Sequence, residues 1–157
     1  MLSILYRGND SEQNALGQFC QNILRDSFWP YEEFCLSLKI PQTFLLYRSS
    51  APDLWQGLAL GRVMGGVAEL FFIFVHPISR GQGLAGEMLK DFEWHCSETY
   101  QADSVMLEVR VSNLAAIRLY EKFGYQRIHK RKRYYQDGED AFVYSKTIKP
   151  GQEGCTE

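Results

Sequence analysis

A glycine-rich turn offers the first candidate binding chemistry in this chain. The stretch SRGQGLAGEML, residues 79–89, follows directly on the apolar run LFFIFVHP. A helix that begins at such a turn leaves its first backbone N–H groups without partners at the positive end of the helix dipole. Glycine tolerates positive φ and has no Cβ, so a phosphate can approach these groups. The turn therefore predicts an anion site formed by Gly81, Gly83 and Gly86 with Arg80 at its rim, although such glycines are equally typical of a tight turn without a ligand.

The spacing of these glycines excludes two common phosphate-binding motifs. They do not form the GxGxxG pattern with an acidic residue some twenty positions later, which is typical of dinucleotide sites. No Gly-Lys-Ser/Thr follows them, so the turn is not a P-loop.

Two glutamates are candidate general bases. In MLEVR, strand alternation turns Glu108 to one face and its apolar neighbours to the other, and a carboxylate in such surroundings is a plausible base with a raised pKa. An ion pair with Arg110 or with the basic segment 130–133 is the alternative interpretation. Glu69, in AELFF, is the second candidate, and for it an exposed charge at the start of a strand is the alternative.

A tyrosine downstream is a candidate general acid. Tyr120 follows Asn113 by seven residues, or about two turns on the same face of a helix. A phenol, with a pKa of about 10, can donate a proton to a departing thiolate. The alternatives are core packing for Tyr120 and a helix N-cap for Asn113, and capping does not exclude contact with a ligand.

Composition limits the class of protein. The chain has 157 residues, 45% of them hydrophobic and 23% charged, which is ordinary for one globular domain. A net charge of −2 gives no overall attraction to nucleic acid or an anionic membrane. Its longest apolar stretches, about eight residues, are too short to span a bilayer. The four cysteines form no CxxC pair and no leader segment is apparent, so we expect reduced thiols, a cytoplasmic location and no metal site.

Hydrophobic periodicity predicts alternating strands and helices. Helices are expected at 11–28, with Ser11 as its cap, at 30–39, opening with Pro30, and at 83–100 and 113–124. Strands are expected at 2–8, 42–49, 54–65, 67–77, 104–110, 125–135 and 140–148. Gly65-Gly66 is a hairpin signal, so the strands around it should be antiparallel. We expect a single α+β domain over residues 1–149 and a loose tail at 150–157.

The glycine turn resembles a motif of the GNAT family of acetyl-CoA-dependent N-acetyltransferases. In that motif, Gln/Arg-x-x-Gly-x-Gly/Ala, the positions are filled here by Arg80, Gly83 and Ala85. The stretch LEVRVSNLAAIRLYEKFGYQ, residues 107–126, is similar to the branch that acetylates protein N-termini, especially the bacterial enzymes acting on the N-terminal alanine of a ribosomal protein. The resemblance extends over roughly residues 25–148 and is weak in the first 25. It implies a mixed, mostly antiparallel sheet of about six or seven strands flanked by about four helices.

The resemblance also implies site residues, with acetyl-CoA as co-substrate. It makes Glu108 the base, Tyr120 the acid and Asn113 a hydrogen-bond partner of CoA, while Glu69 occupies the position of the base in the histone-lysine branch. The strand edge and the glycine turn would hold the pantetheine and pyrophosphate through Ile73, Phe74, Val75, Arg80, Gly81, Gln82, Gly83, Leu84, Ala85 and Gly86. The side chains of Phe72 and Phe74 are expected in the sheet core. Tyr134 and Tyr135 match a tyrosine pair that lines the peptide entrance.

The acceptor implied by the resemblance is a protein or peptide N-terminus, with that of a ribosomal protein as the first candidate. An α-amino group has a pKa of about 7.7 to 8.0 against about 10.4 for lysine, so a single carboxylate acting through water could suffice. No cysteine has an identifiable base, which favours direct transfer without an acetyl-enzyme. The basic run HKRKR should pair with DGED across a turn rather than bind nucleic acid. A small-molecule amine or a lysine as acceptor, and a non-catalytic acetyl-CoA-binding module, are the alternatives.

Overall fold

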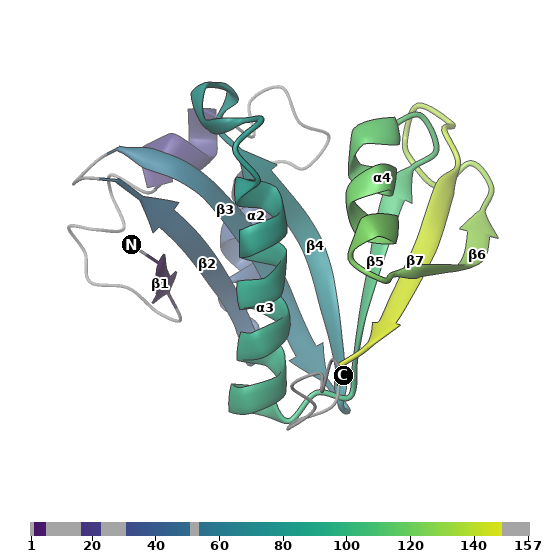
Figure 1. Cartoon of the computed structure of the whole chain (residues 1–157), viewed down its shortest axis with the longest axis horizontal. Helices are drawn as coiled ribbons and strands as arrows, with labels where there is room; N and C mark the ends of the chain where they lie inside the picture. The colour runs from purple at the N-terminus through teal and green to yellow at the C-terminus, as the bar shows by residue number, and fades with distance from the viewer. Residues whose placement is uncertain (1, 6–16, 23–30, 51–53, 149–157) are drawn as a thin grey trace, which may run out of the picture.

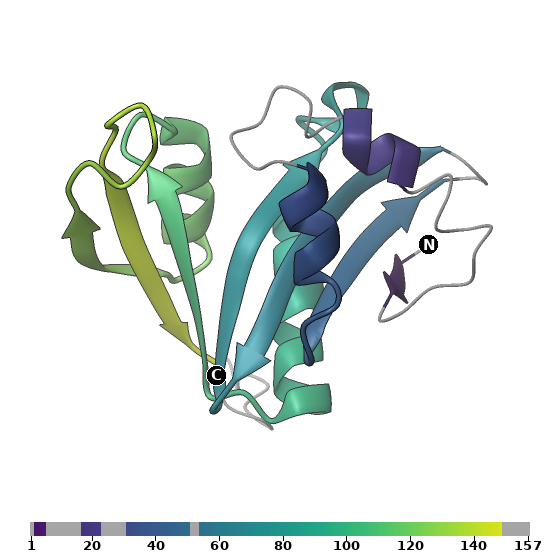
Figure 2. The ribbon, with the colours of Figure 1, turned by 180° about the vertical axis from the view of Figure 1, so that it is seen from behind.

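The protein is built on one seven-stranded sheet. The structure, a computed structural model, describes residues 2–5, 17–22, 31–50 and 54–148. The strand order is β1-β2-β3-β4-β5-β7-β6, as Figures 1 and 2 show from opposite sides. The strands are β1 (Leu2–Leu5), β2 (Thr43–Ser49), β3 (Trp55–Met64), β4 (Val67–Val75), β5 (Ser104–Arg110), β6 (Gln126–Arg131) and β7 (Ala141–Thr147).

All neighbouring strands are antiparallel except the central pair, β4 and β5, which run parallel. The β3–β4 hairpin turns at Gly65 and Gly66, whose φ values of 59° and 80° fit the turn that Gly-Gly favours. This confirms the predicted hairpin. Since the parallel pair needs a crossover, the chain passes through α3 (Leu84–Tyr100) between β4 and β5.

Helices cover both faces of the sheet. Helix α3 lies on one face, and α4 (Leu114–Lys122) packs on the β5 and β7 part of the same side (Figure 1). Their apolar side chains and those of the sheet form the larger core cluster, which includes Phe92, Leu107 and Tyr120. Helix α2 (Tyr31–Ser37) and the helical residues 17–22 lie on the other face (Figure 2). A smaller cluster forms there around Cys20 and Phe34.

Most predicted elements are present, with two local differences. A short 3₁₀ helix, η1 (Pro77–Ser79), which was not predicted, precedes the glycine turn. The strand expected over 125–135 ends at Arg131, because the chain turns there and Arg133 adopts a φ of 49°. The predicted Ser11 cap, the Pro30 start and the 150–157 tail lie outside the described residues, and the domain extent of 1–149 stays a prediction. None of the helices in the described ranges has the length and apolar character needed to cross a bilayer.

Candidate active site

The two central strands, β4 and β5, separate about halfway along their length. Strands β4 and β5 pair only from Val67 with Ser104 to Leu70 with Leu107. Beyond this point β4 runs on to Val75 and β5 to Arg110, and they diverge in a V that is plain in Figure 1. The far half of β4 therefore has a free edge toward β5.

A bulge in β4 lies where the strands separate. Leu60 of β3 pairs with Phe72, but the next residue, Gly61, pairs with Leu70, so Phe71 is the extra residue. A bulge bends its strand and increases the local twist. The bulge therefore gives a local physical reason for β4 to turn away from β5 directly after Leu70.

The V contains a cavity of about 660 Å³. It is lined by residues of β4, β5, α2, α4 and the segment between β6 and β7. The lining residues are Glu33, Glu69, Leu70, Phe71, Phe72, Ile73, Glu108, Val109, Arg110, Asn113, Ala116, Tyr120, Tyr134, Tyr135 and Gln136. The cavity thus gathers both candidate bases, the candidate acid, Asn113 and one residue of the 73–75 edge.

Glu108 is placed in the cavity by the alternation of β5. Its apolar neighbours Leu107 and Val109 are buried in the core on the opposite face. The Glu108 side chain is 20% exposed, and its Oε1 lies 2.9 Å from Nε of Arg131. The ion pair that was the alternative interpretation is therefore present, with the basic segment and not with Arg110. It leaves Glu108 on the cavity wall.

Tyr134 lies against the same carboxylate. Burial, together with the hydrogen bond to Glu108 and the charge of Glu108, raises the pKa of Tyr134 to about 12. Its ring meets that of Tyr135 edge-on, with the two centroids 5.2 Å apart. Both tyrosines line the cavity, so the tyrosine pair and the candidate base form one wall.

Glu69 faces the cavity but is more exposed. Its side chain is 48% exposed, and Oε2 lies 3.7 Å from Nη2 of Arg62. Glu69 also lines a second cavity of about 200 Å³, which it shares with Glu108 and Arg131. Since an exposed carboxylate is well solvated, Glu108 is the more desolvated of the two candidate bases.

Tyr120 combines core packing with contact to the cavity. Its ring centroid lies 5.7 Å from that of Tyr125 and 6.4 Å from that of Tyr144, and the residue is only 5% exposed. Burial raises the pKa of the Tyr120 hydroxyl well above its usual range, and the nearby Tyr135 adds to the effect. The phenol therefore keeps its proton at neutral pH. Asn113 caps the same helix, since its Oδ1 accepts a hydrogen bond of 3.2 Å from the Ala116 N–H.

The glycine turn forms an open cradle at the start of α3. Gly81 and Gly83 have φ values of 75° and 80°, and no heavy atom lies within 4 Å of where a Cβ would stand on either. The N–H groups of Gly86 and Glu87 both donate to the Gly83 carbonyl. The helix N–H groups before Gly86 therefore have no intrahelical acceptor, which suits an anion.

Two other residues of the predicted anion site, Gly86 and Arg80, make contacts that the sequence did not predict. Gly86 lies inside α3 without a positive φ, and a Cβ there would come within 2.4 Å of Cζ of Phe123. The expected conformational role of Gly86 is thus wrong, because this glycine allows α3 to pack against Phe123. Arg80 donates from Nε to the Val75 carbonyl at 3.0 Å and so ties the turn to the end of β4.

The strand residues preceding the turn divide between core and edge. Phe72 and Phe74 stack at 6.3 Å between ring centroids and pack against the smaller core cluster, as predicted for their side chains. Ile73 and Val75 pack against the larger cluster. What this stretch offers the cavity is therefore chiefly its backbone along the free edge of β4.

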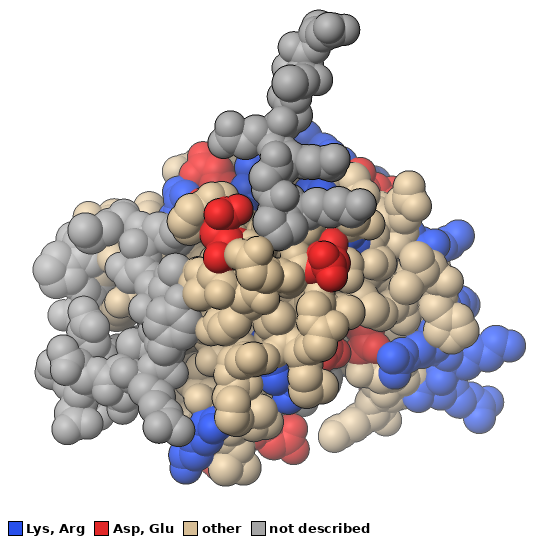
Figure 3. Space-filling model, turned by 90° about the horizontal axis from the view of Figure 1, so that it is seen from below, with Lys and Arg blue, Asp and Glu red and all other residues tan. Residues whose placement is uncertain are grey.

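The basic run is only partly neutralised by DGED. Lys130 pairs with Asp140 at 2.8 Å, as predicted, but Arg131 turns to Glu108. Figure 3 shows Lys and Arg side chains gathered on the side of the molecule where β6 forms the edge of the sheet.

Sequence reasoning missed Glu33 and Gln136 as residues that line the cavity, since neither carries a motif or a periodic signal.

Comparison with known proteins places this arrangement in a family. The family model described as Acetyltransferase (GNAT) family matches residues 23–125, so the chain belongs to that family. The N-alpha-acetyltransferase RimI of Mycobacterium tuberculosis is 32% identical over 127 residues, covering 78% of both chains. The [ribosomal protein bS18]-alanine N-acetyltransferase of Salmonella typhimurium is 36% identical over 110 residues, covering 68% of this chain and 74% of the relative.

Solved structures agree on the fold. The crystal structure of the ribosomal-protein-S18-alanine N-acetyltransferase from Escherichia coli matches with a TM-score of 0.74 at 28% identity and covers all of both chains. The chain spans only 36% to 62% of the length of several other curated relatives. The predicted GNAT fold is confirmed.

Proposed function

We propose that this protein transfers an acetyl group from acetyl-CoA directly to the α-amine of a protein N-terminus. The observation that carries the proposal is the parting of β4 from β5 around a cavity that Glu108 and Tyr120 both line. A base and an acid on two walls of one cavity suit the two proton transfers of amide formation. Family membership supplies the acetyl chemistry.

Acetyl-CoA is proposed to lie along the V from the glycine turn to the cavity. The open backbone at Gly81 and Gly83 suits the pyrophosphate, with Gln82, Leu84 and Ala85 completing the turn. The free edge over residues 73–75 suits the amide groups of pantetheine, and its N–H groups can stabilise the oxyanion. Asn113, at the start of α4, is proposed to hydrogen-bond the same arm.

The proposed reaction uses Glu108 as the base and Tyr120 as the acid, and it releases one proton to solvent. Glu108, directly or through water, accepts the proton that the acceptor ammonium loses, and the neutral amine attacks the thioester carbonyl. A C–N bond forms and the C–S bond breaks as Tyr120 donates its proton to the departing thiolate. The attacking nitrogen then gives up its second proton, which restores the Tyr120 phenol, and Glu108 passes the first proton to solvent. Since burial keeps the pKa of Tyr120 above its usual range, the proton is available at neutral pH.

The proposed acceptor is the N-terminal alanine of a ribosomal protein, because two of the relatives above are named for that activity. The test measures free CoA thiol released with peptides that begin with Ala, Ser or Met, including a peptide with the ribosomal N-terminus. We expect the highest kcat/KM for Ala. Preference for Met, or equal rates for all three, would contradict the alanine assignment.

Glu69 supports one competing acceptor class. It shares the cavity wall with Glu108, and a second base would suit an amine of higher pKa, such as a lysine or a polyamine. Turnover of N-blocked lysine peptides or polyamines that is lost in Glu69→Gln would favour this alternative. Binding of acetyl-CoA without turnover of any amine would favour a non-catalytic module.

Gly83→Ala is expected to weaken acetyl-CoA binding about tenfold, because a methyl group would enter the proposed pyrophosphate cradle. The matched control is Gly65→Ala, since Gly65 also has a positive φ and open space around it but lies at the β3–β4 hairpin. Both variants should lose about 1 kcal/mol of stability from backbone strain. Calorimetric titration with acetyl-CoA and thermal unfolding separate the two effects, and equal affinity loss in both variants would refute the cradle.

A further inference from the structure

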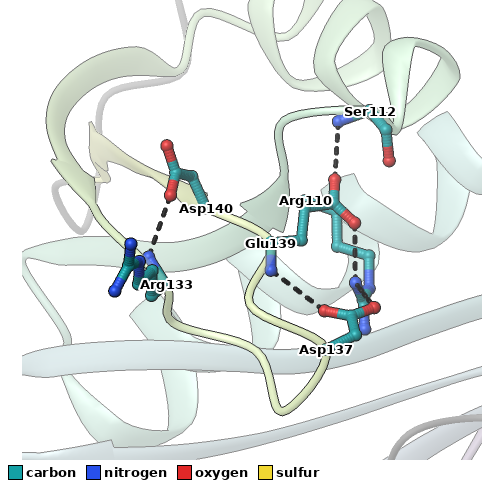
Figure 4. A network of polar contacts seen from close by, with 6 residues as sticks. All are labelled: Arg110, Ser112, Arg133, Asp137, Glu139 and Asp140. Carbon is teal, nitrogen blue, oxygen red and sulfur yellow. Dashed lines mark hydrogen bonds and ion pairs between the residues drawn. The ribbon is translucent and has the colours of Figure 1, made fainter.

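Arg110 is the centre of a polar network at the end of β5. Its Nη1 lies 2.7 Å from Oδ2 of Asp137 and 2.6 Å from Oε2 of Glu139. Both carboxylates belong to the segment between β6 and β7, as Figure 4 shows. One guanidinium thus joins the last residue of the strand that carries Glu108 to two points on that segment.

The two carboxylates are themselves fixed by the backbone. Oε1 of Glu139 accepts a hydrogen bond of 2.9 Å from the Ser112 N–H, and Oδ1 of Asp137 accepts one of 3.0 Å from the Glu139 N–H. These hydrogen bonds, together with Arg110, hold the pKa of both carboxyls below their usual range. The network therefore stays charged at every pH at which the enzyme would work.

The segment that the network holds carries the tyrosine wall of the cavity. The Tyr135 N–H donates to the Glu139 carbonyl at 3.1 Å, and the Gly138 N–H donates to the Tyr135 carbonyl at 2.8 Å. Gly138 has a φ of 83°, which permits this tight turn. Cζ of Arg110 also lies 4.0 Å from the centroid of the Tyr135 ring. Arg110 therefore contacts Tyr135 directly and through the turn that follows it.

We propose that Arg110 is a positioning residue, which holds the segment between β6 and β7 so that Tyr134 and Tyr135 form the acceptor side of the cavity. The proposal rests on the proposed function. The glycine turn and the 73–75 edge lie on other elements. Asn113 is held by the backbone carbonyl of Arg110 and by its cap to Ala116, which a change of the Arg110 side chain retains. Arg110 should therefore govern the affinity for the acceptor and leave that for acetyl-CoA unchanged. A planar guanidinium can bind two carboxylates while it stacks on a ring, whereas an ammonium cannot do all three.

The kinetic test compares Arg110→Gln and Arg110→Lys with wild type. We expect the KM for an N-terminal peptide to rise about 10- to 100-fold in Arg110→Gln and by less in Arg110→Lys, with kcat changed less than about threefold. The KM for acetyl-CoA should not change. The matched control is Arg127→Gln. Arg127 of β6 stacks on Phe142 of β7 at 4.5 Å, in the two strands that flank the same segment, but it does not line the cavity. A fall in kcat at unchanged acceptor KM would overturn the proposal.

Hydrogen exchange of the amides in residues 132–140 gives a readout that needs no turnover. Exchange at Tyr135 and Gly138 should be faster in Arg110→Gln and unchanged in Arg127→Gln, and equal protection in Arg110→Gln and wild type would overturn the proposal. A wild-type protein that acetylates no α-amine would instead refute the proposed function. The exchange data would still decide whether Arg110 holds this segment.

Discussion

Replacing Glu108 with Gln is expected to lower kcat/KM for an N-terminal peptide by about 100- to 10,000-fold, the usual range for the loss of a general base. The amide has nearly the shape of the carboxylate, so the cavity wall should persist while the proton acceptor is lost. Steady-state release of CoA thiol at saturating acetyl-CoA measures the effect. Binding of acetyl-CoA should be unchanged, because Glu108 lies on β5, away from the glycine turn.

Glu69→Gln is the matched control for this prediction. Glu69 lines the same cavity but is 48% exposed and pairs with Arg62 at 3.7 Å. We expect its kcat/KM to stay within about threefold of wild type, as for a solvated surface charge. A larger loss of kcat/KM in Glu69→Gln than in Glu108→Gln would make Glu69 the general base and contradict the assignment of Glu108.

Tyr120→Phe is expected to lower kcat by about 100-fold or more, because the thiolate would leave without a proton donor. The phenyl ring preserves the contacts with Tyr125 and Tyr144, so the protein should remain folded. The peptide KM and the affinity for acetyl-CoA should change little. Tyr125→Phe is the control, since Tyr125 is equally buried but does not line the cavity, and it should retain most activity.

The pH dependence of the wild-type rate gives a second test of Tyr120 as the general acid. Burial raises the pKa of Tyr120, so this phenol stays protonated through pH 10. The rate should therefore rise as the acceptor amine loses its proton near pH 8 and then level off, without a basic limb below pH 10. A fall in kcat between pH 8 and 9 would argue against Tyr120 as the acid. Normal turnover in Tyr120→Phe would exclude it.

Local signals in the sequence predicted the elements on either side of the site well. Helix α3 keeps apolar residues at intervals of four from Leu84 to Cys96, and its ends match the prediction closely. Asn113 is the predicted cap of α4, and strict alternation placed Glu108 on the face opposite its apolar neighbours. These features depend on residues a few positions apart, which is why sequence alone could supply them.

The features that no local pattern could decide depend on distant parts of the chain. The separation of β4 from β5 goes with a bulge at Phe71, whose register is set by pairing with β3. The partner of Glu108 is Arg131 and not Arg110: Arg131 reaches across β7 from β6, while the turn between β6 and β7 brings Asp137 and Glu139 to Arg110. Likewise, the tight contact of Gly86 with Phe123 joins two helices.

Transfer to an α-amine is best tested with one peptide that carries both kinds of amine. The peptide has a free N-terminal alanine and one internal lysine, and its twin is identical but blocked at the N-terminus. After incubation with the protein and acetyl-CoA, fragmentation in a mass spectrometer locates the acetyl group. We expect acetylation of the α-amine alone and an unmodified twin. Acetylation of the lysine in the blocked twin at a comparable rate would contradict this expectation.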